Sequence, residues 1–338
     1  MERALEEEKE KTLCSISPIL DSNSNFSDTM NEQTVIGKLN EDTVLPCSFE
    51  NGPDIAIHWK IKDHNVHSFY KDSDQLARQS PIYSSRTSLF HSEIHNGNAS
   101  LCLRRLSLQD AGIYTCYVGT KLTRTEKKVV LIVGALLMPT MNYEMINSSI
   151  FLTCGVSMIY PHSSITWQVG NESVSESSVE ELESPFHIKS TRNITFSNKP
   201  YKCVIENSLL KEIWRGQWTM TDDLHKIQNE DISLSCSLAN NFLLLTEDFI
   251  VTWSRIKNGT SSVLAYFLNS SQNLTINEPR FSWNKDLIHQ NDLSSTLRNL
   301  DISDSGEYLC NISSSKYTLL TVNKLHVETG SPVPTEED

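Results

Sequence analysis

The segment Asp110-Ala-Gly-Ile-Tyr114-Thr-Cys116 is the most informative part of the sequence, because it returns 194 residues later as Asp304-Ser-Gly-Glu-Tyr308-Leu-Cys310. The same offset relates four further pairs of residues: Trp59 and Trp253, Arg86 and Arg280, Leu103 and Leu297, and Leu106 and Leu300. Self-similarity at a fixed spacing is the signature of repeated structural units. The sequence therefore predicts two copies of one domain type.

The residues of this motif have defined places in a β-sandwich. A cysteine on each sheet can be joined through the core, and a Trp packs against the disulfide. The Tyr that lies two residues before the second Cys ties a corner to the backbone through its hydroxyl group. Each motif also has an Arg 24 residues before its Asp, so we expect Arg86 to pair with Asp110 and Arg280 with Asp304. The motif is typical of an immunoglobulin-like sandwich.

The spacing of the cysteines extends the prediction to the whole chain. Three disulfides are expected: Cys47 with Cys116, Cys154 with Cys203, and Cys236 with Cys310. The first and third pairs are 69 and 74 residues apart, which leaves room for the extra strands of a variable-type domain, whereas the second pair is only 49 apart. We therefore predict an all-β fold of three tandem immunoglobulin-like β-sandwich domains in the order V-type, C-type, V-type.

The expected domain boundaries follow from this order and from the composition of the junctions. Pro139 ends the last apolar strand of the first domain, and a Pro- and Glu-rich tail follows the third. The expected segments are a disordered or alternative leader (1–30), V-type domain 1 (31–135), C-type domain 2 (138–222), V-type domain 3 (223–328) and a stalk (329–338).

Two cysteines remain outside this framework. Cys102 lies between the inward-facing Leu101 and Leu103, so we expect its side chain to face away from the core, and Cys14 lies in the leader. They could pair with each other or with a partner chain. The interpretation we favour gives neither a structural role, because nothing around them forms a disulfide framework.

Composition indicates an extracellular protein. The 338 residues carry a formal net charge of −13, which argues against nucleic-acid partners and against binding to anionic membrane surfaces. Widely spaced cysteines and nine N-x-S/T sequons favour the secretory pathway. We predict glycosylation at the eight sequons within the domains: Asn98, Asn147, Asn171, Asn193, Asn258, Asn269, Asn273 and Asn311.

The termini do not follow the usual secretory pattern. The chain begins Met-Glu-Arg-Ala-Leu and continues with charged residues instead of the apolar run of a signal peptide. It has no apolar stretch of about 20 residues, which is the length that spans a bilayer. We expect the parent protein on the extracellular side of the plasma membrane, and this chain to be a secreted form or a trimmed ectodomain that lacks the signal peptide and the transmembrane helix.

No pattern of residues indicates catalysis. The sequence lacks a nucleophile elbow, a phosphate-binding loop, a zinc-protease helix motif and a dinucleotide-binding turn. We interpret His58, His64 and His67 as solvated surface histidines, and the basic run Lys121–Lys128 as a solvated hairpin edge. We therefore expect no enzymatic activity, no metal, no cofactor and no small-molecule substrate.

The first domain carries a candidate binding face. Tyr117 follows the inward-facing Cys116, so it should point outward from the sheet that contains it. We predict a receptor-binding surface made of aromatic and basic residues: His58, Lys60, Phe69, Tyr70, Tyr117, Lys121 and Arg124. The alternative is that Phe69 and Tyr70 pack within the domain and that Tyr117 is an ordinary exposed aromatic residue.

The third domain differs at the corresponding places. Asn311 stands where the first domain has Tyr117, and it begins a sequon. Asn258, Asn269 and Asn273 lie near the neighbouring strands. Glycans at these sites would cover that face, so we expect the first domain to bind the partner.

Six segments carry a family resemblance: Met30-Asn-Glu-Gln33, His58-Trp-Lys60, Asn96–Ser100, Gly112–Gly119, Ile205–Lys211 and Ser305–Ser313. With the domain order they resemble the B7 family of costimulatory ligands, from about Met30 to Val327. The resemblance implies a cell-surface ligand that regulates T cells and natural killer cells. It also implies two partners: a transmembrane and immunoglobulin-domain-containing receptor, and a killer-cell immunoglobulin-like receptor. A homophilic or heterophilic adhesion protein is the alternative.

Overall fold

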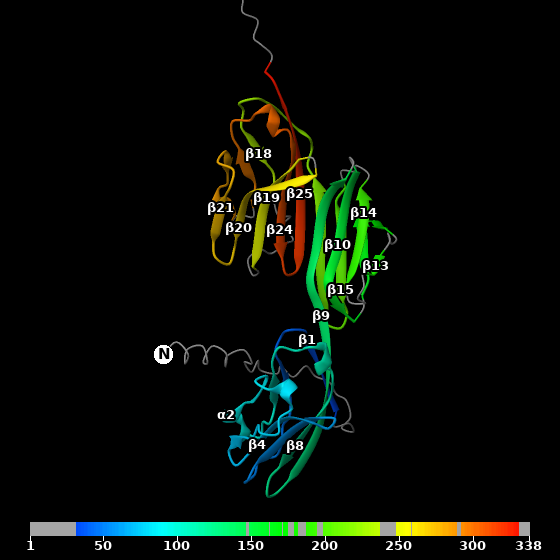
Figure 1. The fold of residues 1–338 in the computed structure, drawn as a ribbon, viewed down its shortest axis with the longest axis vertical. Helices are drawn as coiled ribbons and strands as arrows, with labels where there is room; N and C mark the ends of the chain where they lie inside the picture. Colours follow the sequence, from blue (N-terminus) through cyan, green and yellow to red (C-terminus); the bar gives the residue numbers. More distant parts are fainter. Residues whose placement is uncertain are drawn as a thin grey trace, which may run out of the picture. The chain divides into compact units, whose positions relative to one another are not determined.

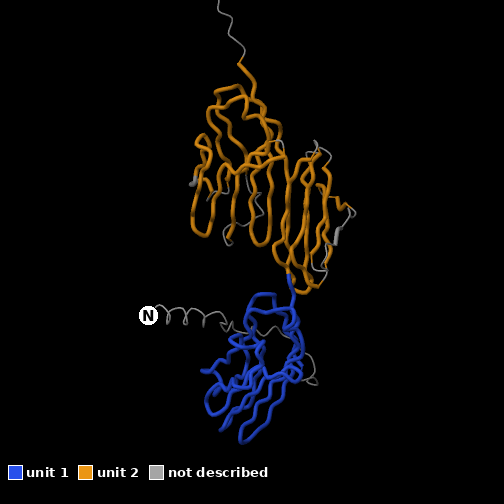
Figure 2. The backbone as a smooth tube through the Cα atoms, viewed as in Figure 1, with its two compact units in different colours: residues 1–135 blue, residues 136–338 orange. Residues whose placement is uncertain are grey.

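The computed structural model describes residues 32–146, 149–161, 163–170, 172–174, 179–181, 187–194, 199–236, 248–257, 259–288 and 292–330. The predicted leader (1–30) and residues 331–338 of the predicted stalk lie outside these residues. The chain forms two compact units, residues 1–135 (unit 1) and 136–338 (unit 2), which Figure 2 distinguishes by colour. The described residues are mostly β-strands, which confirms the all-β prediction.

Unit 1 is a sandwich of two sheets (Figure 1). Its larger sheet, which we call the front sheet, has the order β5 (Ser73–Asp74), β4 (His64–Tyr70), β3 (Ala56–Ile61), β8 (Gly112–Gly119) and β9 (Arg124–Ile146), with β1 (Glu32–Lys38) parallel to β9. The second sheet has the order β2 (Thr43–Leu45), β7 (Leu101–Leu103) and β6 (Thr87–Leu89). Short helices lie in the connections: η1 (Pro81–Tyr83), α2 (His91–Ile94) and η2 (Leu108–Asp110).

The core of unit 1 forms because alternate residues of each strand are apolar. On β8, Tyr114, Cys116 and Val118 are buried while their neighbours are partly or fully exposed. Cys116 is bonded to Cys47 across the two sheets. Trp59 is fully buried in the same cluster, and its indole N–H donates to the Ala99 carbonyl oxygen at 2.9 Å. Side chains at period two thus turn one face of each sheet inward.

The repeated motif holds the same contacts in both copies. The hydroxyl groups of Tyr114 and Tyr308 donate to the backbone carbonyl oxygens of Asp110 and Asp304, at 2.9 and 2.7 Å. The predicted ion pairs are confirmed: Arg86 with Asp110 and Arg280 with Asp304. Both Asp residues are almost fully buried.

Unit 2 contains one large sheet and two smaller groups of strands. The large sheet has the order β12 (Glu172–Val174), β11 (Ile165–Val169), β15 (Tyr201–Asn207), β16 (Glu212–Met220), β25 (Tyr317–Glu328), β24 (Gly306–Ser314), β19 (Phe249–Lys257), β20 (Thr260–Leu268) and β21 (Asn273–Ile276), with β17 (Leu224–Ile227) also on β25. Opposite it lie β13 (Val179–Glu181), β14 (Ile188–Ile194), β10 (Ser149–Tyr160) and the end of β9, and separately β18 (Ile232–Leu234), β23 (Ser295–Leu297) and β22 (Phe281–Ser282). Two short helices are also described in unit 2: α3 (Lys285–Ile288) and η4 (Ile302–Asp304).

Unit 2 contains two separate apolar clusters, and each of them includes one disulfide. The disulfide Cys154–Cys203 lies in one apolar cluster and Cys236–Cys310 in the other. Together with Cys47–Cys116 in unit 1, these are the pairs expected from the sequence spacing.

The two clusters of unit 2 are joined by a continuous sheet, which the sequence did not indicate. Strand β16 pairs in parallel with β25, from Arg215 opposite Tyr317 to Met220 opposite Val322. Figure 1 shows β20, β19, β24 and β25 side by side in this sheet. The side chains of Leu320 and Val322 belong to the core cluster around Cys154–Cys203. Part of the β25 surface is therefore buried against its neighbour.

The prediction that Cys102 has no structural role is wrong. Its side chain is fully buried on β7, and it is one of the disulfide-bonded cysteines. It is not a member of the core cluster of unit 1, as expected for a side chain that faces away from Leu101 and Leu103. The second unassigned cysteine, Cys14, lies outside the described residues. A single cysteine between two core leucines carries no pattern that distinguishes a bonded from a free thiol.

Candidate protein-binding face

The outer surface of the front sheet of unit 1 is built by strand register. Tyr117 on β8 lies opposite His58 on β3 and Glu126 on β9, and His58 lies opposite Ser68 on β4. The next outward row contains Thr115 opposite Lys60. Because side chains of directly paired residues lie on the same face, these strands bring together residues far apart in the sequence.

Tyr117 is the centre of a cluster of aromatic and basic side chains. The Lys60 ammonium lies 5.9 Å from the centroid of the Tyr117 ring, a cation–π distance. The rings of His58 and Tyr70 are 6.0 Å apart. Tyr117 and Tyr70 remain 38% and 37% exposed, so each presents an aromatic edge to solvent. We call these four residues the aromatic cluster.

The imidazole of His58 is held in place below this cluster. Its Nδ1 atom lies 3.0 Å from the Ser68 hydroxyl oxygen, which in turn is hydrogen-bonded to the Asn65 amide. Burial, together with the neighbouring Lys60 ammonium, lowers the pKa of His58. His58 is therefore mostly neutral near pH 7, so the positive charge of the aromatic cluster is that of Lys60.

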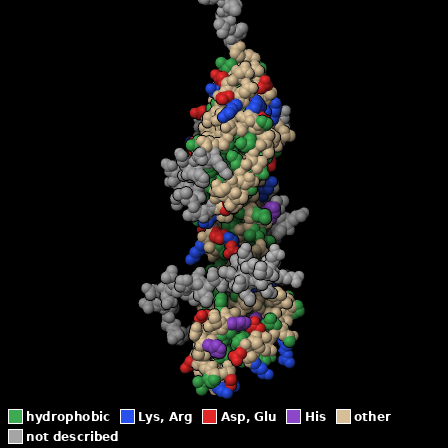
Figure 3. Space-filling model, turned by 90° about the vertical axis from the view of Figure 1, so that its left-hand side faces the viewer, with side chains coloured by type: hydrophobic (Ala, Val, Ile, Leu, Met, Phe, Trp, Pro, Cys, Tyr) green, Lys and Arg blue, Asp and Glu red, His purple; other side chains and the backbone are tan. Residues whose placement is uncertain are grey.

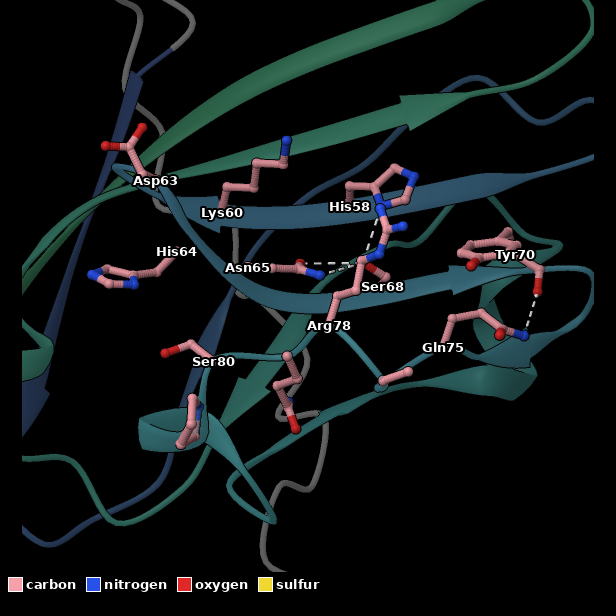
Figure 4. Close-up of a pocket in the computed structure, with 13 residues that line it drawn as sticks. His58, Lys60, Asp63, His64, Asn65, Ser68, Tyr70, Gln75, Arg78 and Ser80 are labelled. Atoms are coloured by element: carbon pink, nitrogen blue, oxygen red, sulfur yellow. Dashed lines mark hydrogen bonds between the residues drawn. The ribbon is translucent and has the colours of Figure 1, made fainter.

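A groove runs beside the aromatic cluster, with a volume of about 790 Å³ (Figure 4). His58, Lys60, Asn65 and Ser68 line the side formed by β3 and β4. The opposite wall is the segment 75–81, which we call the strap, and it contributes Arg78. Figure 4 shows Tyr70 at one end of the groove and His64 with Asp63 at the other.

Hydrogen bonds fix the strap to β4. The backbone N–H groups of Gln75 and Ser80 donate to the carbonyl oxygens of Ser68 and Asn65, both at 2.8 Å. The side-chain amide of Gln79 donates to the Val66 carbonyl oxygen at 2.9 Å. The groove therefore has two firm walls, and a partner would not need to order them.

The tip between β8 and β9 supplies the remaining predicted residues. Lys121 forms an ion pair with Asp54 at 2.5 Å, with both side chains about two-thirds exposed. Arg124 is exposed at the start of β9. Leu122, between them in the sequence, is 74% exposed. The tip thus combines charge with an unburied aliphatic side chain.

Two of the sequence predictions for this region are wrong. Phe69 is 5% exposed and packs in the core, because it pairs with inward-facing Ile57, and adjacent residues of a strand point to opposite faces. Tyr70 keeps the outward position, so the two cannot both belong to the face. His67 is 1% exposed and contacts the Thr87 hydroxyl and the Asp74 carboxylate at 2.9 and 3.1 Å. It is a buried residue, not a solvated one.

The sequence reasoning also missed three surface residues. Ile113 is 50% exposed on β8 and shares the outward side with Tyr117, which strict alternation could have shown. Leu122 could have been noted as an apolar residue in a predicted hairpin tip. Arg78 had no signal, because it reaches the groove through the irregular strap.

The predicted glycosylation sites are placed only in part. Asn98 forms an isolated bridge with Ser48 just before β7, away from the front sheet. Asn193 is exposed on β14. Three sites are on or beside the large sheet of unit 2: Asn269, Asn273 and Asn311. The other three predicted sites lie outside the described residues: Asn147, Asn171 and Asn258. Glycan attachment remains a prediction at all eight.

Neither metal-binding chemistry nor a bilayer-spanning helix is present in the described part of the chain. No group of three His, Cys, Asp or Glu side chains there could hold a metal ion. No helix there is long and apolar enough to cross a membrane. Figure 3 shows acidic, basic, histidine and hydrophobic side chains intermixed over the visible part of unit 1.

Comparison with known families adds an independent observation. The immunoglobulin V-set domain matches residues 30–133 and residues 219–328, which contain the two copies of the internal repeat.

Three curated proteins show where the sequence similarity lies. Human HERV-H LTR-associating protein 2 is 58% identical over 302 residues, covering 88% of this chain and 73% of that protein. Human V-set domain-containing T-cell activation inhibitor 1 is 31% identical, covering 64% of this chain and 80% of that protein. A CD276 antigen homolog of Xenopus laevis is also 31% identical, covering 56% of this chain and 67% of that protein.

Proposed function

The chain belongs to the immunoglobulin V-set family and to its B7-like ligands of the immune system, and from this premise we propose that it regulates lymphocytes by binding receptors through unit 1. The observation that carries the proposal is the aromatic cluster on the front sheet. Tyr is one of the residue types enriched among those that dominate the binding energy of protein interfaces. Unit 1 has no sequon on this sheet, so glycans would leave the cluster accessible.

The partners of the proposed interaction are immunoglobulin-domain receptors. One relative is named as a T-cell activation inhibitor, which supports a T cell as the target. For the individual receptors we propose the transmembrane and immunoglobulin-domain-containing receptor of T and natural killer cells, and a killer-cell immunoglobulin-like receptor. We also propose that the chain acts by binding alone, as a protein displayed at the cell surface, and is not an enzyme.

The proposal is tested by the substitution Tyr117→Ala in the full chain. Surface plasmon resonance against the two receptor ectodomains should show a loss of about 2 kcal/mol, or about 30-fold in affinity, for at least one receptor. Val44→Ala is the control, because Val44 is a partly exposed apolar residue on β2 in the second sheet of the same unit. Full affinity of a correctly folded Tyr117→Ala variant would reject the face. Self-association of the wild-type chain without binding to either receptor would favour the adhesion alternative.

A further inference from the structure

The groove beside the aromatic cluster carries a charge opposite to that of the chain. Lys60 and Arg78 both line it, and neither forms an ion pair with a carboxylate of the described residues. Among the described residues, Asp63 is the one acidic side chain in its lining, at the end marked by His64 (Figure 4). In a chain with a net charge of −13, two cations that line one groove without a carboxylate partner among the described residues are a local exception. The groove is therefore suited to an anion.

The surroundings of the two cations narrow the kind of anion. Arg78 is an exposed guanidinium whose planar fork matches the geometry of a carboxylate. The same groove is lined by hydrogen-bonding groups of Asn65, Ser68 and His58, which can contact the remaining oxygen of such a group. Two cations with neutral donors suit the oxygens of an anion such as a carboxylate, and a protein partner supplies carboxylates from its Asp and Glu side chains.

The size of the groove indicates which kind of protein segment would carry the carboxylate. A volume of about 790 Å³ exceeds what one acidic side chain fills. The hydrogen bonds between the strap and β4 keep the walls apart, so the space is present before binding. A loop tip that carries an acidic residue fits both the volume and the charge.

We propose that the groove between Lys60 and Arg78 receives an Asp or Glu side chain at a loop tip of the receptor domain that docks on the aromatic cluster. This inference rests on the proposed receptor binding and specifies the chemistry of the partner. It adds Arg78 to the interface as a residue that determines specificity. It also places the interface on the β3–β4 side of the front sheet and beyond it, onto the strap.

The inference is tested with the full chain and the same two receptor ectodomains as probes. Arg78→Gln should weaken the affinity about fivefold to tenfold, mainly through slower association, and Arg78→Glu should weaken it further. The affinity of the wild type should fall as NaCl is raised from 50 to 300 mM, and that fall should be smaller for Arg78→Gln. Arg105→Gln is the matched control, because Arg105 is an exposed cation in the connection from β7 to η2. It should bind within twofold of the wild type.

The outcomes separate this inference from the proposed function. If Tyr117→Ala loses binding while both Arg78 variants keep the affinity and salt dependence of the wild type, the inference about the groove is overturned. The proposed receptor-binding face would still stand. Absence of wild-type binding to both receptors would overturn the proposed function and the groove together. If Arg78→Gln no longer weakens the affinity after sialidase treatment of the receptor, the carboxylate belongs to a glycan. That result would overturn the inference that it comes from an Asp or Glu side chain. A weaker, less salt-sensitive Arg78→Gln variant on untreated and desialylated receptor supports the inference.

Discussion

The buried Arg86–Asp110 pair offers the sharpest test of what stabilises unit 1. Arg86 donates five hydrogen bonds: two to the Asp110 carboxylate and one each to the carbonyl oxygens of Ile82, Arg104 and Arg105. Asp110 is 2% exposed. The substitution Arg86→Met keeps most of the aliphatic stem and removes all five donors. It leaves a carboxylate in the protein interior without its counter-ion.

The size of the effect follows from what Asp110 retains. Removing one member of a buried ion pair costs about 3–5 kcal/mol, because the remaining charge is desolvated and uncompensated. The Ser107 backbone N–H and hydroxyl still donate to the Asp110 carboxylate, at 2.7 and 3.1 Å. We therefore expect the lower end of the range, a loss of about 3 kcal/mol in the free energy of unfolding of unit 1.

The second copy of the motif supplies an internal comparison. Arg280 donates to both oxygens of Asp304, at 2.7 and 2.9 Å, but the Arg255 guanidinium also lies 3.7 Å from that carboxylate. Burial opposes ionisation of Asp304, yet Arg280, the Asp301 backbone N–H and Arg255 outweigh it and lower the pKa of Asp304. Because Arg255 remains when Arg280 is replaced, Arg280→Met should cost only about 1–2 kcal/mol.

Differential scanning calorimetry of the full chain measures both variants. A loss of 3 kcal/mol should lower the transition of unit 1 by roughly 12 °C or more, since 1 kcal/mol corresponds to about 4–8 °C in a domain of this size. Hydrogen exchange read by mass spectrometry assigns each transition to its unit. A shift of only about 2 °C in Arg86→Met, or a larger loss in Arg280→Met than in Arg86→Met, would show that the ion pair does not stabilise unit 1 in this way.

Three further outcomes are expected. Phe69→Ala should lower the free energy of unfolding by about 3–5 kcal/mol in urea denaturation, whereas Tyr70→Ala should change it by about 0.5 kcal/mol or less; equal losses would contradict the assigned faces. Burial lowers the pKa of His67 although Asp74 acts in the opposite direction, so the folded state resists a proton that the unfolded chain accepts. Stability of unit 1 should therefore decrease as the pH falls below about 6.5, and His67→Gln should flatten that dependence; an identical pH profile in the variant would count against it. Tyr143→Phe removes the hydroxyl group that donates to the buried Glu307 carboxylate at 2.6 Å, and it should destabilise unit 2 by about 1–2 kcal/mol in calorimetry, with no change as the contrary result.

Much of the fold could be predicted because the deciding residues make contacts specific to one architecture. A Tyr two residues before a Cys, and an Arg at a constant distance from an Asp, are side-chain patterns that only a shared geometry keeps in register. The structure places Tyr114, Asp110 and Arg86 in those contacts. Strand alternation also predicted that Tyr117 points outward.

The sequence predictions fail where the position of a side chain or strand depends on its neighbours along the strand or on backbone that is distant in the sequence. The aromatic character of Phe69 and Tyr70 favours the face for both, whereas the period of two along a strand allows only one of them there. Arg78 reaches the groove through the strap, whose path depends on hydrogen bonds to β4. The pairing of β16 with β25 joins main-chain groups, which are the same in every sequence. The sequence therefore contains no residue pattern that predicts the pairing of β16 with β25.

The shared sheet of unit 2 also sets a limit on how the protein can be dissected. A recombinant fragment that begins after Met220 would lose β16 and leave one side of β25 from Tyr317 to Val322 without its partner. That fragment would expose a strand edge with unpaired backbone hydrogen-bonding groups, together with the apolar side chains of Leu320 and Val322. Such a combination is prone to aggregation. Residues 136–330 are therefore the smallest fragment of unit 2 that we expect to fold and stay in solution when it is expressed by itself.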